Sequence, residues 1–270
     1  MTGYKEMPPA MILCGGKGTR LRDVTELLPK PMVSIGEQPI VWHIMKTYAA
    51  FGVKRFILCL GYKRECFVDY FANYRLRTSD TTICIGRKNQ IRFHAAEADD
   101  EWEITLAGTG VSSGTGTRVR IASKYLREDD DCFFLTYGDG VSNIDIAAEL
   151  EFHRAQKTAL TVGAVHPAAR FGEIRISQEG KVKSFVEKPS RISGYINGGF
   201  MVMDKSFVSR FIPEEDCFLE QQPLNAACRA GEMAAFRHEG FWQCMDTPRE
   251  HAMLNEMWNS GTAPWTEFWK

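Results

Sequence analysis

The chain has 270 residues and a formal net charge of −1 at pH 7, with 44% hydrophobic and 25% charged residues. This composition is typical of a globular protein with a sizeable core, and it gives no overall charge that would attract a nucleic acid or a membrane surface. The eight cysteines contain no CxxC pair, which argues against a zinc site and for reduced thiols. Because neither a signal-peptide pattern nor an apolar run of membrane-spanning length occurs, we expect a cytoplasmic protein.

The first 165 residues alternate between short apolar runs and helical patterns. The helix predicted over 39–52 has Pro39 in its first turn and Gly52 just past its end. The predicted strands span 10–14, 54–60, 81–86, 90–96, 131–138 and 158–165. The other predicted helices span 63–74, 117–126 and 144–157. This alternation predicts an α/β fold with a mainly parallel sheet flanked by helices.

After residue 165 the pattern changes to short strands separated by turns. These strands are predicted over 172–177, 181–188 and 195–204, and helices return over 204–211, 220–231 and 248–260. We found no linker that would divide the chain. The sequence therefore predicts a single domain with a mixed-strand C-terminal part.

Three glycines follow the first predicted strand, in the segment GGKGTRL. The segment is not a Walker A motif, because Lys17 lies between Gly16 and Gly18, and it is not a dinucleotide fingerprint, because Leu21 replaces the third glycine. Glycine backbone and the guanidinium of Arg20 nevertheless suit a phosphate group. A strand-ending turn with solvated cations is an equally good interpretation of these residues alone.

Three charged residues beyond this loop are candidates for the same chemistry. Lys30 lies between two prolines, which restrict its backbone, although an ordinary lysine on a rigid loop remains open. Asp139 ends a predicted strand, where open α/β sheets bind ligands, and its oxygens suit Mg²⁺ unless it is a turn residue. Asp246 is a second such carboxylate or a helix N-cap, and spacing alone does not bring the two together.

The sequence GGKGTRL followed by PKPM resembles the opening signature of the sugar-1-phosphate nucleotidyltransferases. The resemblance implies a Rossmann-like sheet and a glycine-rich loop around a nucleoside triphosphate, with Arg20 and Lys30 as the catalytic cations. It also implies Mg²⁺ held by Asp139 and Asp246. Further nucleotide contacts are implied at Leu13, Gly15, Gly16, Gly18, Thr19, Thr109, Gly110, Ser113 and Arg118.

The segments SFVEKPS and YINGGF match the sugar-binding part of the same family. The resemblance assigns Glu187 and Lys188 to the sugar hydroxyls and the sugar phosphate. Further sugar-phosphate contacts are implied at Tyr137, Gly138, Arg170, Phe171, Gly172, Asn197, Gly198 and Trp242. Residues 8–165 would then form the nucleotide-binding half of the domain, and residues 166–270 the sugar-phosphate-binding half with the C-terminal helices.

The further segments TYGDGV, RFGEIRI, EQQPL and GFWQCMDT are similar to the branch of this family that uses CTP and glucose 1-phosphate. The resemblance covers residues 10 to 270. It implies in-line attack of the sugar phosphate on the α-phosphorus of CTP, release of pyrophosphate, and a homo-oligomer in which a neighbour's loop closes the nucleotide site.

The segment over 106–119 departs from that branch, because Gly108 replaces a carboxylate that the branch tends to have. Transfer of another nucleotide, from UTP, dTTP or GTP, or to another phosphorylated acceptor, is therefore an open alternative. An inactive regulatory module is a further alternative, disfavoured because Arg20, Lys30 and both aspartates are present. Among the histidines, we expect His43 in the core and His153 on a solvated helix face.

Overall fold

The computed structural model describes residues 6–16, 28–86, 90–94, 101–167, 172–187 and 194–269. Several residues named above lie outside the described residues: Lys17, Gly18, Thr19, Arg20, Leu21, Arg170, Phe171 and Lys188.

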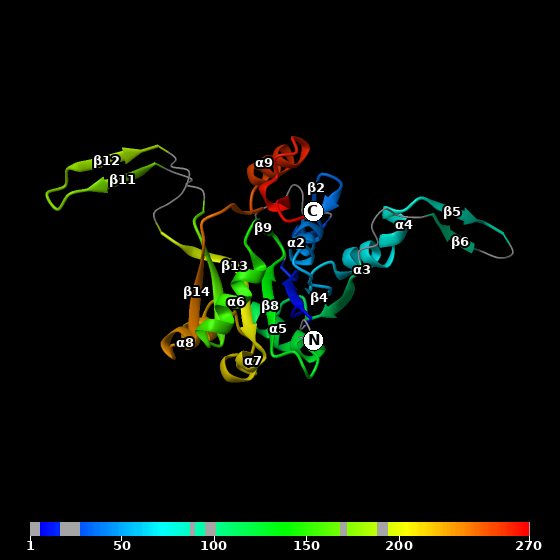
Figure 1. The fold of residues 1–270 in the computed structure, drawn as a ribbon, viewed down its shortest axis with the longest axis horizontal. Coiled ribbons are helices and arrows are strands. Elements are labelled where there is room, and N and C mark those ends of the chain that lie inside the picture. Colours follow the sequence, from blue (N-terminus) through cyan, green and yellow to red (C-terminus); the bar gives the residue numbers. More distant parts are fainter. Residues whose placement is uncertain are drawn as a thin grey trace, which may run out of the picture.

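A seven-stranded sheet forms the centre of the molecule, in the order β14-β10-β13-β8-β1-β4-β7 (Figure 1). The strands are β1 (Ala10–Leu13), β4 (Arg55–Leu60), β7 (Glu103–Gly108), β8 (Cys132–Tyr137), β10 (Leu160–Val165), β13 (Ile196–Asp204) and β14 (Met233–His238). β13 runs antiparallel to both of its neighbours, and all the other pairs are parallel. The predicted mixed, mainly parallel sheet is confirmed.

Helices cover both faces of this sheet, and β1 shows the reason. Ala10 and Ile12 pack into one hydrophobic cluster, whereas Met11 and Leu13 pack into another. A strand that is apolar on both faces has to be covered on both faces. The first cluster includes side chains of α2 (Ile40–Ala49), α3 (Arg64–Ala72), α6 (Ile146–Gln156) and α9 (Pro248–Asn259). The second includes side chains of α5 (Thr115–Ala122), α7 (Lys205–Phe211) and α8 (Gln222–Arg229).

The sequence patterns missed six of the described strands, including the two-residue strands β2 (Ser34–Ile35) and β3 (Gln38–Pro39). β7 and β14 are the two edges of the main sheet, and many of their side chains are partly or fully exposed, so neither forms the continuous apolar run of a central strand. β9 (Gly140–Ser142) and β15 (Trp242–Cys244) are too short for a periodic pattern. Pro39 is the N-cap of α2, one position before the first helical residue, whereas the prediction placed it within the first turn.

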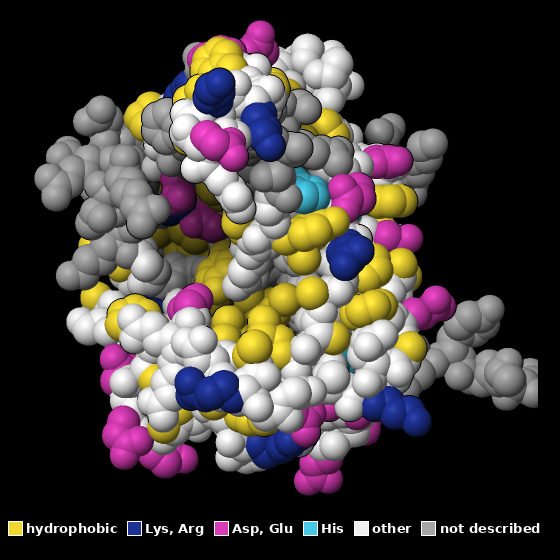
Figure 2. All heavy atoms as spheres, turned by 90° about the vertical axis from the view of Figure 1, so that its left-hand side faces the viewer, with side chains coloured by type: hydrophobic (Ala, Val, Ile, Leu, Met, Phe, Trp, Pro, Cys, Tyr) yellow, Lys and Arg dark blue, Asp and Glu magenta, His cyan; other side chains and the backbone are white. Residues whose placement is uncertain are grey.

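Two antiparallel ribbons project from opposite sides of the body (Figure 1). One consists of β5 (Thr81–Cys84) and β6 (Gln90–Phe93), and the other of β11 (Glu173–Ile176) and β12 (Val182–Val186). Both carry exposed apolar side chains, at Ile83, Ile91, Ile174, Ile176, Val182, Phe185 and Val186. Figure 2 views the molecule from the side of the β11–β12 ribbon, and hydrophobic side chains gather along a hollow in the middle of that face.

The remaining short elements are α4 (Tyr74–Thr78), β2 (Ser34–Ile35), β3 (Gln38–Pro39), and the 3₁₀ turns η2 (Lys30–Met32), η3 (Ser123–Tyr125) and η4 (Pro264–Thr266). Within the described part of the chain, no helix has both the length and the apolar character that crossing a bilayer requires.

The two histidine predictions differ in outcome. His43 is fully buried, as predicted, and burial lowers its pKa to about 4. The prediction for His153 is wrong, because its side chain is buried between α6 and the sheet. Its ring nitrogens lie 3.0 Å from Thr161 Oγ1 and 3.1 Å from Asp204 Oδ1. A histidine on a charged helix can be buried where tertiary partners accept and donate its hydrogen bonds.

Candidate active site

The carboxyl ends of β1 and β8 open into a pocket of about 390 Å³. It is lined by Leu13, Cys14, Gly15, Gly16, Lys30, Pro31, Ser113, Thr115, Arg118, Tyr137, Gly138, Asp139, Phe218 and Asp246. Many of the residues singled out in the sequence, from distant parts of the chain, therefore line one cavity. Its location at the strand ends is the usual place for a ligand in an open α/β sheet.

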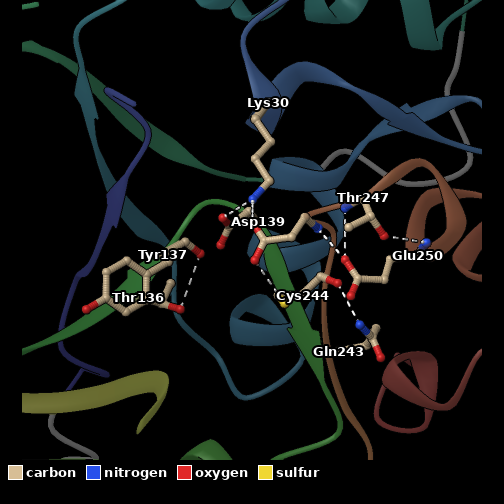
Figure 3. Close-up of polar contacts among 9 residues, drawn as sticks. Lys30, Thr136, Tyr137, Asp139, Gln243, Cys244, Thr247 and Glu250 are labelled. Atoms are coloured by element: carbon tan, nitrogen blue, oxygen red, sulfur yellow. Dashed lines mark hydrogen bonds and ion pairs between the residues drawn. The ribbon is translucent and has the colours of Figure 1, made fainter. Parts of the chain in front are cut away.

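Lys30 joins the two candidate metal ligands at the pocket wall (Figure 3). Its Nζ donates to Asp139 Oδ2 at 2.6 Å and to Asp246 Oδ1 at 2.5 Å. The lysine begins η2 directly after Pro29, which is extended at φ −67° and ψ 147°. The lysine is 9% exposed. The sequence interpretation of Lys30 as a side chain presented at one defined place agrees with this geometry.

Strand pairing brings the two aspartates together. Asp139 precedes β9, and Asp246 follows β15, which pairs antiparallel with β9. The Met245 amide also donates to the Asp139 carbonyl oxygen at 2.8 Å. Because β9 and β15 are each three residues long, no periodic pattern could predict this pairing.

Asp246 is not the cap of the helix that follows it. Thr247 is the N-cap of α9, in a capping box with Glu250, and the Asp246 amide donates to Glu250 Oε2 at 2.7 Å. The Asp246 carboxylate is instead directed toward Lys30, whose Nζ donates to it. Of the two interpretations that the sequence left open, the helix N-cap is excluded, because Thr247 is the cap and the Asp246 carboxylate accepts from Lys30.

The charges in this cluster are mutually dependent. Burial by itself would lower the pKa of Lys30, but the charge of Asp139 and hydrogen bonds to both aspartates raise it. The ammonium is therefore positively charged and neutralises much of the repulsion between the carboxylates.

The two carboxylates are the candidate donor set for a metal ion. Because Asp139 Oδ2 and Asp246 Oδ1 lie within 2.6 Å of one nitrogen, they are already arranged around a cation. Within the described residues no group of three or more His, Cys, Asp or Glu side chains could hold a metal ion. Two carboxylates fit Mg²⁺, which usually takes one or two protein ligands and completes its shell with phosphate oxygens and water.

Arg118 has a different role from Lys30, although both line the pocket. Its guanidinium is buried and donates to Thr109 Oγ1 at 2.9 Å, to Gly110 O at 2.7 Å and to Gly15 O at 3.2 Å. A Cβ at Gly15 would lie 1.9 Å from Arg118 Nη1, so a glycine is required there. Arg118 thus joins the start of the glycine-rich loop to the segment after β7. Its contact with a nucleotide stays a prediction.

The other predicted nucleotide residues lie around this connection. Leu13, Gly15, Gly16 and Ser113 line the pocket directly. Thr109 is buried behind them and donates its hydroxyl to Leu60 O at 2.8 Å.

The predicted sugar residues divide into two groups. Tyr137 and Gly138 line the pocket, and the Tyr137 ring packs against Gly199, where a Cβ would lie 2.3 Å from Cδ2. Beside them, Trp242 Nε1 donates to Gly198 O at 2.7 Å, and Asn197 Oδ1 accepts from the Gly199 amide at 2.9 Å.

The second group lies at the base of the β11–β12 ribbon. Glu187 is exposed there, and a Cβ at Gly172 would lie 2.9 Å from Glu187 Oε2, so these two residues adjoin. Neither of them lines the pocket.

Sequence reasoning missed part of the pocket wall. Thr115 and Phe218 line the cavity, and Phe218 is 51% exposed. Two signals adjoin them in the sequence: Thr115 lies in the segment that departs from the cytidylyl branch, and Phe218 lies two residues before the segment EQQPL.

The fold and this charged pocket define a class of protein, and comparison with known proteins agrees. The chain belongs to the nucleotidyl transferase family, whose model matches residues 9–243. The family expected from the sequence is confirmed.

Individual relatives show which members of this family the chain is similar to. Glucose-1-phosphate cytidylyltransferase of Salmonella typhi is 45% identical over 256 residues, which are 95% of this chain and 98% of that protein. The probable glucose-1-phosphate cytidylyltransferase of Bacillus subtilis is 38% identical over the same proportions. The crystal structure of HddC from Yersinia pseudotuberculosis has a TM-score of 0.67 at 24% identity, and the match covers 93% of this chain and all of that one. This last likeness supports the fold.

Proposed function

We propose that this chain transfers CMP from CTP to α-D-glucose 1-phosphate, with CDP-glucose and pyrophosphate as the products. The observation that carries the proposal is the pocket at the strand ends, where Lys30 joins Asp139 and Asp246. The substrates follow from the two cytidylyltransferase relatives, whose alignments span almost the whole chain.

The chemical difficulty of this reaction is to bring two polyanions into contact. The attacking phosphate oxygen is already negatively charged at neutral pH, so no strong general base is required. Catalysis then depends on orienting the two substrates and neutralising their charge. Lys30 would contact phosphate oxygens, and Arg20, which lies outside the described residues, is proposed to hold the triphosphate with it.

Asp139 and Asp246 are proposed to hold Mg²⁺, which when bound supplies charge stabilisation for the phosphate oxygens and the leaving pyrophosphate. Because Lys30 contacts both carboxylates, its ammonium would exchange them for phosphate oxygens when substrate enters. This exchange needs no backbone movement, because a lysine side chain has four rotatable bonds.

On the sugar side, the proposal assigns Tyr137, Asn197, Gly198 and Trp242 to the ring of the sugar. Their hydrogen bonds and packing join the end of β8 to β13 and β15 beside the pocket. Glu187 and Lys188 are proposed to approach the sugar from the base of the β11–β12 ribbon.

We further propose that the chain is a cytoplasmic homo-oligomer. The described cysteines are free thiols, as expected of a reducing compartment. Isolated two-stranded ribbons are marginal in water, and the exposed isoleucines of β5–β6 and β11–β12 would be covered by a neighbouring copy. Light scattering during gel filtration tests this, with a mass of one chain as the contradicting result.

A nucleotide panel tests the reaction itself. The protein is mixed with Mg²⁺, glucose 1-phosphate and each of CTP, UTP, dTTP and GTP, and pyrophosphate release is followed. We expect CTP to be used best. Efficient use of UTP without CTP would show that the departure at Gly108 accompanies a different base preference, and the same assay with other sugar 1-phosphates tests the acceptor.

A further inference from the structure

The segment over 216–219, between α7 and α8, forms a fixed wall of the pocket. The Asp216 carboxylate accepts the Gly114 amide at 2.9 Å, and the Cys217 carbonyl oxygen accepts the Gly116 amide at 3.0 Å. A Cβ at Gly116 would lie 2.6 Å from Cys217 Sγ, so the segment packs directly on the start of α5. These contacts therefore hold the backbone in place just before Glu220.

Glu220 follows this segment, and each of its two carboxylate oxygens accepts a hydrogen bond. Oε1 accepts from the Tyr137 hydroxyl at 2.5 Å, and Oε2 accepts from the Thr115 hydroxyl at 2.6 Å. Tyr137 ends β8 and Thr115 begins α5, and both line the pocket. An exposed glutamate ordinarily keeps its rotamer freedom, so two short hydrogen bonds indicate that this side chain has a defined task.

The direction of these hydrogen bonds determines what Tyr137 can offer a ligand. An ionised carboxylate only accepts, so the Tyr137 hydroxyl donates its hydrogen bond to Glu220. The Asn197 side chain donates to the phenol oxygen, which leaves one lone pair of that oxygen for a ligand. The Thr115 hydroxyl donates to Glu220 and accepts from the Leu219 amide at 2.8 Å, so it is already engaged. The Tyr137 ring is fixed by Gly199, whose φ of +80° and missing Cβ make the contact possible.

We propose that Glu220 is a positioning residue, which fixes the Tyr137 hydroxyl so that its oxygen accepts a hydrogen bond from a hydroxyl group of the bound sugar. This inference rests on the proposed function and extends it to the choice of acceptor. A carboxylate repels phosphate groups, so this part of the pocket suits the uncharged hydroxyls of the sugar. A sugar that lacks the matching hydroxyl would leave the second lone pair of the Tyr137 oxygen without a donor.

Steady-state kinetics with three variants test the proposal. Glu220→Ala and Tyr137→Phe should each raise the KM for glucose 1-phosphate about five- to tenfold, as expected for one hydrogen bond, and leave the KM for CTP unchanged. The double variant should be no worse than Tyr137→Phe alone, because Glu220 acts through Tyr137. Glu220→Gln should recover part of the loss, since its amide oxygen still accepts from the phenol.

Glu215→Ala is the matched control, because it removes an exposed carboxylate from the same loop; its kinetics should not change. Independent effects in the double variant, or a rise in the KM for CTP, would overturn the proposal. So would a lowered thermal unfolding midpoint of Glu220→Ala with an unchanged KM for the sugar phosphate. If the wild-type protein does not use glucose 1-phosphate, the proposed acceptor is wrong, and the same cycle is then measured with the sugar phosphate that it accepts.

Discussion

Lys30 and Arg118 are both buried cations in the wall of one pocket, but their partners differ. Lys30 donates to the carboxylates of Asp139 and Asp246. Arg118 donates to a hydroxyl and to backbone carbonyl oxygens, including Gly15 O and Gly110 O. If Lys30 moved away, its carboxylate partners could bind another cation. If Arg118 moved away, the buried carbonyl oxygens would be left without a hydrogen-bond donor. The comparison indicates that Lys30 is available for chemistry and that Arg118 holds the pocket together.

The comparison between Lys30 and Arg118 predicts that the largest loss of activity follows from substitutions at Lys30 and its carboxylate partners. Lys30→Ala or Asp139→Asn should lower turnover about 10²–10³-fold, equivalent to about 2.7–4 kcal/mol of transition-state stabilisation. The first removes a charge at the reacting phosphates, and the second removes a proposed Mg²⁺ ligand. Circular dichroism should show an intact fold. Lys54→Ala, which removes an exposed lysine at 3.2 Å from Glu101, is the control. Near-normal turnover of either variant would refute the catalytic assignment.

Glu149 contrasts with Lys30 and Arg118, because it is a buried ionisable group whose side chain has no hydrogen-bond partner among the described residues. Glu149 on α6 is fully buried, neither carboxylate oxygen has a hydrogen-bond partner in the described residues, and burial raises its pKa to about 8. The folded protein therefore binds a proton that the unfolded chain releases near its ordinary pKa of 4.5. The stabilisation is complete below pH 4.5 and is lost as the pH rises to about 8.

Glu149→Gln should remove this pH dependence and raise the free energy of unfolding at pH 7 by about 3 kcal/mol. Urea unfolding at pH 5 and pH 7 measures it. Glu151→Gln, on the same helix but exposed, is the control. Parallel stability curves for wild type and Glu149→Gln would contradict the prediction.

Arg118→Met should destabilise the fold, by about 2–3 kcal/mol, because buried carbonyl oxygens lose their donors. Thermal unfolding measures the change, and Arg127→Met, at an exposed arginine, is the control. We expect a smaller catalytic effect than for Lys30→Ala when both variants are assayed well below their unfolding midpoints. A stable Arg118→Met protein with little activity would reverse the roles of the two cations.

The smallest effect is expected in metal binding without nucleotide. The Lys30 ammonium contacts both proposed metal ligands, so Lys30→Met should bind Mn²⁺ about tenfold more tightly than the wild-type protein, a change of about 1.4 kcal/mol. Electron paramagnetic resonance of free Mn²⁺ measures this directly. Equal Mn²⁺ affinities of the two proteins would mean that Lys30 does not compete with the metal ion. The double variant Lys30→Met/Asp139→Asn is the control, and it should lose the tighter Mn²⁺ binding of Lys30→Met.

Much of the site was predictable because its residues adjoin recognisable local patterns. The apolar runs that became β1 and β8 predicted where Gly15 and Asp139 would lie, since both follow strand ends. Thr115, Phe218 and Glu220 were not predictable in this way, because they become a wall only when the segment before α8 packs on α5.

The burial of His153 also depended on distant residues. The charged helix that carries it packs on the sheet, where Thr161 and Asp204 supply its hydrogen bonds. Nothing in the sequence of the helix itself contains that information.

The sequence by itself determined the alternation of strands and helices, the family, and the identity of the charged groups. These follow from periodicity and from short motifs, which are local properties of the chain. The tertiary structure alone decided which charges meet. Asp139 and Asp246 converge on Lys30 through the pairing of β9 with β15, and a three-residue strand pair is stabilised by the surrounding core rather than by its own sequence.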